Sequence, residues 1–142
     1  YCMGRKFDED SKFDNTDMTF HFWKPKSDYL IKEVIKRGYN VLYSSCWYLD
    51  HLANGGDWRK FYSCTIDVKD LSYEQKKRIF GGEVCMWTEV VDESNLISRV
   101  WPRASAAAER LWNYENIEDI EEVSRRLEEH YCRLKEHGIS AQ

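Results

Sequence analysis

Gly81-Gly82-Glu83-Val84-Cys85-Met86-Trp87-Thr88-Glu89 is the stretch on which the prediction of this fold depends. A short apolar run follows a glycine pair and ends in a tryptophan, with a carboxylate two residues later. Such a run, bounded by turn signals, is typical of a buried strand. An aromatic face beside a carboxylate at a strand end suits a sugar ring, because the ring packs its C–H face on aromatic carbon while its hydroxyls donate to carboxylate oxygens.

Working outward from this stretch, the pattern predicts strands that alternate with helices. The expected strands are Met18–Trp23, Asn40–Ser45 and Glu83–Trp87, and the expected helices are Ser27–Arg37, Tyr73–Arg78, Asn95–Trp112 and Ile117–His137. Pro102 interrupts the third helical stretch and is expected near a helix start. Strands that alternate with helices indicate a parallel sheet built from βαβ units.

The predicted fold class is therefore α/β, with about three β/α units belonging to the C-terminal part of a (β/α)8 TIM barrel. A complete barrel needs roughly 250 residues, whereas this chain has 142. Active sites of such barrels lie at the carboxyl ends of the strands. Five candidates lie at or just after the expected strand ends: Trp23, Tyr48, Asp50, Trp87 and Glu89. We therefore expect these five side chains to share one pocket.

Each of these candidates also has a structural interpretation. Glu89 and Asp50 are either solvated loop carboxylates or acceptors for sugar hydroxyls, and Tyr48 can donate its phenolic hydrogen to a substrate oxygen. Trp23 and Trp87 are either core packing or walls of the pocket. Packing is the favoured role for the tryptophans at 47, 58, 101 and 112, and structural ion pairing is favoured for the arginines at 99, 103 and 110.

Composition excludes several classes of function. The net charge is −4 with no basic block, which argues against a nucleic-acid partner. No apolar run reaches the roughly 18 residues of a membrane helix, and no signal peptide is visible. The five cysteines lack C-x-x-C spacing, so we expect neither a metal site nor a cofactor. Cys46 and Cys85 are expected as buried thiols, whereas Cys132 is the better disulfide candidate.

The motifs together resemble the β-N-acetylhexosaminidases of glycoside hydrolase family 20, of the lysosomal type. The resemblance rests on the opening stretch and on four further motifs: Trp47-Tyr48-Leu49-Asp50, Gly56-Asp57-Trp58-x-x-Phe61-Tyr62, Arg99-x-Trp101-Pro102-Arg103-Ala104 and Ala108-Glu109-Arg110-Leu111-Trp112. The family fold is a (β/α)8 barrel preceded by a smaller α/β domain. The resemblance implies that residues 1–142 form the C-terminal portion of the catalytic barrel, without the earlier strands and the N-terminal domain.

The family removes terminal N-acetylglucosamine or N-acetylgalactosamine with retention, and the substrate's own acetamido oxygen acts as the nucleophile. By resemblance, Trp23 and Trp87 enclose the ring and acetamido group, Tyr48 hydrogen-bonds the acetamido oxygen, and Asp50 and Glu89 receive the outer hydroxyls. The acid pair of the family lies in an upstream Asp-Glu segment. The chain by itself is therefore expected not to turn over substrate.

The sequence departs from the family pattern at two places. Thr88 stands where the family usually has glycine, and Ser45-Cys46 replaces a more usual Ala-Pro. Cys132 matches a family cysteine whose disulfide partner lies beyond Gln142.

The predicted parent protein is an exo-acting β-N-acetylhexosaminidase, lysosomal or secreted by resemblance. Its substrate is the amino-sugar end of a glycoprotein, a glycolipid or a chitin-type oligosaccharide, and a homodimer is expected. Two alternatives stay open: a carbohydrate-binding homologue without catalysis, and a structural α/β module whose aromatic residues are all core.

Overall fold

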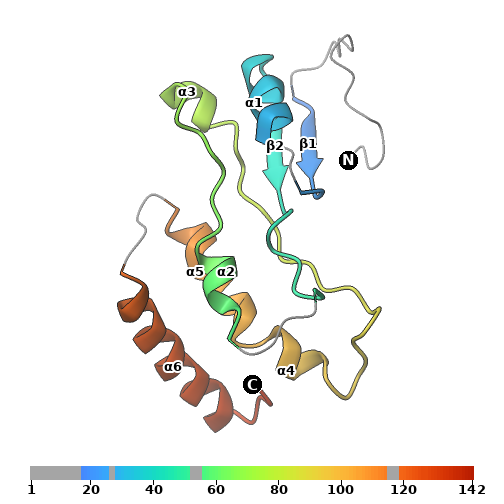
Figure 1. The fold of residues 1–142 in the computed structure, drawn as a ribbon, viewed down its shortest axis with the longest axis vertical. Helices are drawn as coiled ribbons and strands as arrows, with labels where there is room; N and C mark the ends of the chain where they lie inside the picture. The colour runs from blue at the N-terminus through green and yellow to red at the C-terminus, as the bar shows by residue number, and fades with distance from the viewer. Residues whose placement is uncertain (1–16, 26–27, 52–55, 115–118) are drawn as a thin grey trace. The chain divides into compact units, whose positions relative to one another are not determined.

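A computed structural model describes residues 17–25, 28–51, 56–114 and 119–142 (Figure 1). The chain divides into two compact units. The first unit comprises residues 1–45 and 65–83, and the second comprises residues 46–64 and 84–142. The expectation for Ser27 as a helix cap lies outside the described residues, as does Cys2.

The first unit is a βαβ arrangement. Strand β1 (Thr19–Phe22) leads through helix α1 (Asp28–Lys36) to strand β2 (Asn40–Tyr43). The strands pair in parallel, with Thr19 opposite Asn40 and Phe22 opposite Tyr43, and they lie side by side in Figure 1. This confirms the two strands and the helix that the sequence predicts. Gly38 ends the helix with a φ of 90°, a left-handed conformation that favours glycine.

The third predicted strand, Glu83–Trp87, does not form. Only two isolated parallel bridges occur beside the 40–48 region among the described residues, Val41 with Ile79 and Tyr48 with Cys85. Gly81 has a φ of 114°, and the Glu83 amide donates to the Ser44 hydroxyl at 3.1 Å instead of to a strand carbonyl. The described residues contain two paired strands, and the prediction of about three β/α units stays a prediction.

The core of the first unit forms around the apolar stripe of α1. Ile31, Val34 and Ile35 are fully or almost fully buried, as a helix packed against a sheet requires. The other buried apolar residues of this unit are Phe22, Tyr39, Val41, Tyr43, Ile66 and Leu71. A short helix, α3 (Tyr73–Lys76), follows and carries a capping box between Ser72 and Gln75, as Ser72 predicts.

A small polar cluster joins the strands of the first unit. Ser44 is fully buried, and its hydroxyl lies 2.9 Å from Nε2 of His21. His21 also lies 3.3 Å from the Glu83 carboxylate. His21 is thus part of a structural hydrogen-bond network with Ser44, and the Glu83 carboxylate lies beside its ring.

The second unit is helical. It contains α2 (Trp58–Tyr62), α4 (Leu96–Val100), α5 (Arg103–Trp112) and α6 (Ile120–Glu136). Its core joins α2, α5 and α6 through Tyr62, Ala106, Val123 and Leu127, and α2 and α5 lie side by side in Figure 1. Pro102 occupies the N-cap of α5 and divides the expected 95–112 helix in two, consistent with its predicted place. Helix α2 lies where the sequence predicts a loop.

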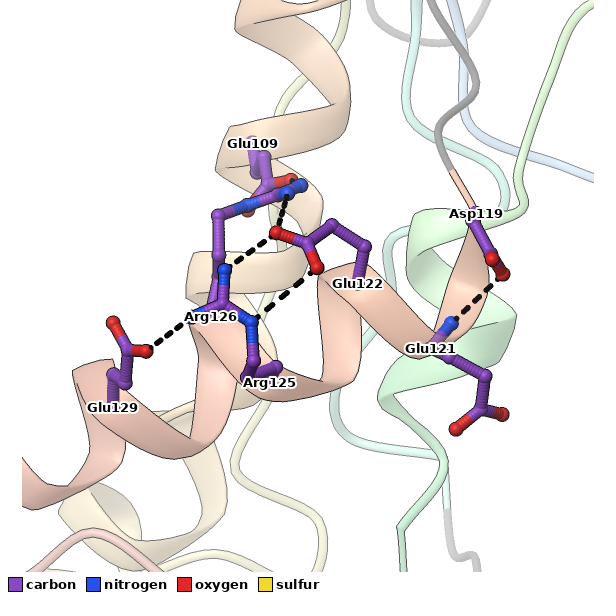
Figure 2. Close-up of polar contacts among 7 residues, drawn as sticks. All are labelled: Glu109, Asp119, Glu121, Glu122, Arg125, Arg126 and Glu129. Carbon is purple, nitrogen blue, oxygen red and sulfur yellow. Dashed lines mark hydrogen bonds and ion pairs between the residues drawn. The ribbon is translucent and has the colours of Figure 1, made fainter.

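Helix α6 is fastened to α5 by charges as well as by its apolar stripe. Figure 2 shows Arg126 of α6 paired with Glu109 of α5, while Arg125 pairs with Glu122 and Glu129 along α6 itself. Asp119 caps the helix by accepting from the Glu121 amide at 3.1 Å. Within the described ranges, no helix combines the length and apolar character that a bilayer crossing demands.

Two predictions of packing have different outcomes. Trp58 packs against the core of the second unit, as predicted. Trp112, at the end of α5, is 92% exposed, so its assignment to packing is wrong within the described structure.

Candidate active-site half

The candidate site in the second unit is formed by the loop of residues 46–51 and the segment of residues 84–89. Cys46 forms a disulfide with Cys64, with the two Cα atoms 6.3 Å apart, within the usual range. The expectation of a buried thiol at Cys46 is therefore wrong: residue 46 is covalently joined to residue 64, two residues after the end of α2. Cys85 and Cys132 keep their thiols in the described structure.

Trp47 anchors the same loop. Its side chain is 3% exposed, and its indole N–H donates to the Phe61 carbonyl at 3.0 Å. This confirms the structural role predicted for Trp47. Since side chains alternate along extended backbone, burial of Trp47 directs its neighbour Tyr48 away from the core.

Arg103 holds the loop from the side of α5. Its Nε and Nη2 donate to the two carboxylate oxygens of Asp57, both at 2.7 Å, and its Nη1 donates to the Leu49 carbonyl at 2.9 Å. Both charged side chains are 13% exposed. A bidentate pair of this kind is strong and geometrically specific, so the main chain between Tyr48 and Asp50 is fixed.

Arg110 acts similarly at the other end of the disulfide. It is 3% exposed and donates to the carbonyls of Cys64 at 3.1 Å and Tyr114 at 3.0 Å. Arg103 therefore confirms the predicted ion pairing with a carboxylate, whereas the described contacts of Arg110 are hydrogen bonds to main-chain carbonyls.

Tyr48 and Trp87 are brought together by main-chain pairing. The Leu49 amide donates to the Cys85 carbonyl at 2.8 Å, and the Cys85 amide donates to the Trp47 carbonyl at 2.9 Å. The phenol of Tyr48 shares hydrogen bonds with the side chains of Cys85 and Trp87. The main chain thus brings the ends of these two extended segments together, while the shared pocket of Tyr48 and Trp87 stays a prediction.

Burial raises the pKa of the Tyr48 phenol above its usual value of 10.0. The nearby Cys85 and the charge of Asp50 act in the same direction, while the hydrogen bond from Trp87 opposes them. A phenol with a raised pKa keeps its proton at neutral pH, so Tyr48 is available as a hydrogen-bond donor.

Asp50 presents an acceptor that the surrounding chain leaves open. No described group forms a hydrogen bond with its buried Oδ1. Buried polar atoms are nearly always satisfied, so an unpartnered carboxylate oxygen beside Tyr48 suits a ligand hydroxyl.

Glu89 and Trp23 complete the predicted set without being drawn into this contact network. Glu89 is exposed two residues after Trp87, which is itself 54% exposed. Trp23 belongs to the first unit, directly after β1, where Lys24 Nζ lies 4.9 Å from its ring centre. The structure thus brings together Tyr48, Asp50 and Trp87, while the inclusion of Trp23 and Glu89 stays a prediction.

The residues that support the site belong to the sequence motifs, but the sequence alone does not predict that they position the site. Asp57 and Arg103 lie 46 residues apart, as do Arg110 and the Cys64 carbonyl it binds. The only indication of these contacts in the sequence is the order of the motifs along the chain. An arginine on a helix and an aspartate on a distant loop can be paired only once the fold is known.

Comparison with known proteins identifies the family of the chain. Residues 5–115 match the family described as glycosyl hydrolase family 20, catalytic domain. The chain is 46% identical over 112 residues to the β-hexosaminidase subunit beta of Felis catus, covering 79% of this chain and 21% of the relative. It is 43% identical over 114 residues to the corresponding subunit of Homo sapiens, covering 79% and 20%.

Solved structures give the same result. The X-ray structure of the Flavobacterium johnsoniae chitobiase matches with a TM-score of 0.74 and 36% identity, over 86% of this chain and 19% of that protein. The chain belongs to glycoside hydrolase family 20, the class that its motifs and the match to residues 5–115 define. It spans about a fifth of the length of the curated relatives it matches.

Proposed function

We propose that the protein containing this chain is a β-N-acetylhexosaminidase that removes terminal N-acetylglucosamine or N-acetylgalactosamine with retention of configuration. Family membership supports the reaction class. The observation that carries the proposal is the contact of Tyr48 with Trp87, beside the open carboxylate of Asp50. A donor, an aromatic face and an acceptor are the three elements that an N-acetylated sugar requires.

In this mechanism the chain supplies the sugar-holding half of the pocket. The Tyr48 O–H donates to the acetamido oxygen and aims it at the anomeric carbon, where the oxygen displaces the leaving group. Trp87 and Trp23 enclose the acetamido group and the ring, and Asp50 and Glu89 accept hydrogen bonds from the outer hydroxyls. The general acid and its partner come from an upstream Asp-Glu pair, so residues 1–142 act as the C-terminal portion of a (β/α)8 barrel.

The disulfide supports the proposed location. Disulfides persist in oxidising compartments and are rare in the cytosol. The Cys46–Cys64 bond is therefore consistent with a lysosomal or secreted protein, as the family resemblance implies. A homodimer is part of the same proposal.

The test uses the full-length protein with two aryl glycosides, one of N-acetyl-β-glucosamine and one of β-glucose. Hydrolysis of the first and not the second is expected, because only the first carries the acetamido nucleophile. Tyr48→Phe should lower kcat by about 100-fold, the usual cost of removing one donor to a developing charge. Tyr73→Phe is the matched control, since Tyr73 is 71% exposed on α3, and it should leave kcat unchanged.

The two alternatives give different results. A carbohydrate-binding homologue would bind N-acetylglucosamine and hydrolyse neither glycoside. If the aromatic residues were only structural, Trp87→Ala and Glu89→Ala would lower the melting temperature. Folded variants without hydrolysis would instead support the pocket.

A further inference from the structure

Cys85 occupies a position next to Tyr48 that the proposed mechanism does not use. The two residues form an isolated parallel bridge, held by the hydrogen bonds from Leu49 N to Cys85 O and from Cys85 N to Trp47 O. The Cys85 side chain is half-buried. The main chain therefore fixes where the thiol lies with respect to the phenol.

The side chains of Trp87, Tyr48 and Cys85 form an ordered series of hydrogen bonds. The indole of Trp87 has a donor and no acceptor, so its bond to Tyr48 ends on the phenolic oxygen. The phenolic hydrogen is then available to the sulfur of Cys85, with which Tyr48 also shares a hydrogen bond. A thiol is both a weak acceptor and a weak donor.

We propose that Cys85 is a positioning residue: its sulfur holds the phenolic hydrogen of Tyr48 before substrate binds and yields it to the acetamido oxygen of the bound sugar. This rests on the proposed function, in which Tyr48 is the donor. Sulfur suits the task because a carbonyl oxygen is the stronger acceptor and displaces it. The phenol is then already oriented when the sugar arrives, so little rotational freedom is lost on binding.

The test is a double-mutant cycle in the full-length enzyme, with kcat and KM measured on the aryl N-acetyl-β-glucosaminide. Cys85→Ala should lower kcat/KM by about three- to tenfold, the range of one neutral hydrogen bond. In a Tyr48→Phe background the same substitution should cause no further loss, because the hydrogen that the sulfur holds is gone. An equal loss in both backgrounds, or no loss in the wild type, would overturn the proposal.

Three variants sharpen the cycle. Cys85→Ser keeps a donor and an acceptor but holds the phenolic hydrogen more strongly than sulfur does, so its kcat/KM should lie between those of the wild type and Cys85→Ala. Cys85→Val removes both while filling a similar volume, so it repeats the test if the alanine variant does not fold. Val84→Ala disturbs the adjacent half-buried position and leaves the phenol untouched, so any loss should be equal with and without the Tyr48 hydroxyl.

Failure of the inference is distinguishable from failure of the proposed function. If Tyr48→Phe alone retained wild-type kcat, the role of Tyr48 would be wrong and Cys85 would have nothing to position. If Tyr48→Phe lost activity while the Cys85 effects were additive with it, the proposed function would stand and the role of Cys85 would be refuted.

Discussion

The two units of this chain hold their main chain in place by different means. In the first unit, β1 and β2 pair directly and α1 covers them with a buried apolar stripe. In the second unit, the loops before α2 and after residue 84 have a single bridge between them among the described residues. There the fastening comes from a disulfide, a buried tryptophan and two arginines that bond to main-chain carbonyls.

This difference between strand pairing and side-chain contacts bears on where the proposed binding site lies. Paired strands satisfy their own main-chain groups, so their side chains pack for stability. The proposed site residues Tyr48, Asp50, Trp87 and Glu89 instead extend from loops, and loops carry function when a rigid scaffold positions them. In the second unit, side-chain contacts to the main chain therefore fix the loop positions, as strand pairing does in the first unit.

The largest expected effect is from removing the charge that fastens the second unit. Arg103→Met leaves Asp57 without its bidentate partner at a site that is 13% exposed. Breaking such a pair costs about 3 kcal/mol or more of unfolding free energy, and kcat should fall because the Leu49 carbonyl is released. Urea denaturation of the full-length protein measures the first effect. The exposed Arg125→Gln is the control, and equal losses for both variants would contradict this account.

Removing the disulfide should have the next largest effect. Cys46 and Cys64 close a loop with a sequence separation of 18, and a loop of that size contributes about 3 kcal/mol. The Cys46→Ser/Cys64→Ser variant should therefore unfold at lower denaturant concentration. Hydrogen exchange measured by mass spectrometry should show faster exchange in residues 46–64 than in β1 and β2. Uniform acceleration throughout the chain would remove the distinction between the units.

The matching change in the first unit should be smaller. Ser44→Ala deletes a buried hydroxyl that lies beside His21 Nε2 and accepts from the Glu83 amide. Leaving those two groups without it costs about 1–3 kcal/mol, while the strand pairing itself remains. The expected readout is a lower melting temperature with unchanged KM. A changed KM would show that this cluster also shapes the site.

The smallest effect concerns the ion pairs of α6. Arg125 lowers the pKa of Glu122 below its usual value of 4.5. A carboxylate with a depressed folded-state pKa contributes stability above pH 4.5, and that contribution is lost as pH falls through the lowered value. Both side chains are exposed (Figure 2), so solvent screening keeps the effect slight. The protection factors of the α6 amides, which divide out the intrinsic pH dependence of exchange, should fall slightly below pH 4.5 in the wild type, and the Glu122→Gln variant should lack this component.

The sequence predicted those features that local pattern determines. The stripe of Ile31, Val34 and Ile35 and the stop at Gly38 are local signals, and α1 forms as expected. The strand at Glu83–Trp87 did not form because a strand needs a continuous partner ladder, and within this described segment only Cys85 pairs with main-chain groups, while the Glu83 amide donates to the Ser44 hydroxyl. Helix α2 was missed because its five residues are too few for a helical period to be seen.

The site was predictable in the same partial way. The sequence predicts that Tyr48 and Trp87 lie at the shared edge of adjacent parallel segments, and the structure pairs those segments at Tyr48 and Cys85; that the two aromatic side chains share a pocket stays a prediction. The Cys46–Cys64 pair could not be foreseen, because five cysteines allow many pairings and spacing alone does not choose among them. Cys46 stands where the family resemblance predicts a proline. This departure from the family pattern is the residue that forms the disulfide with Cys64.

The hydrogen bond from Arg103 to the Leu49 carbonyl bears on how sugar preference could change between related enzymes. The guanidinium holds a main-chain atom, so the contact does not depend on which side chain follows at position 50. Under the proposed function, exchanging Asp50 for another acceptor or donor should change recognition of individual hydroxyls without altering the main chain that Arg103 holds. A main-chain contact that stays constant beside a side chain that can vary is an arrangement that directed evolution of sugar selectivity could use.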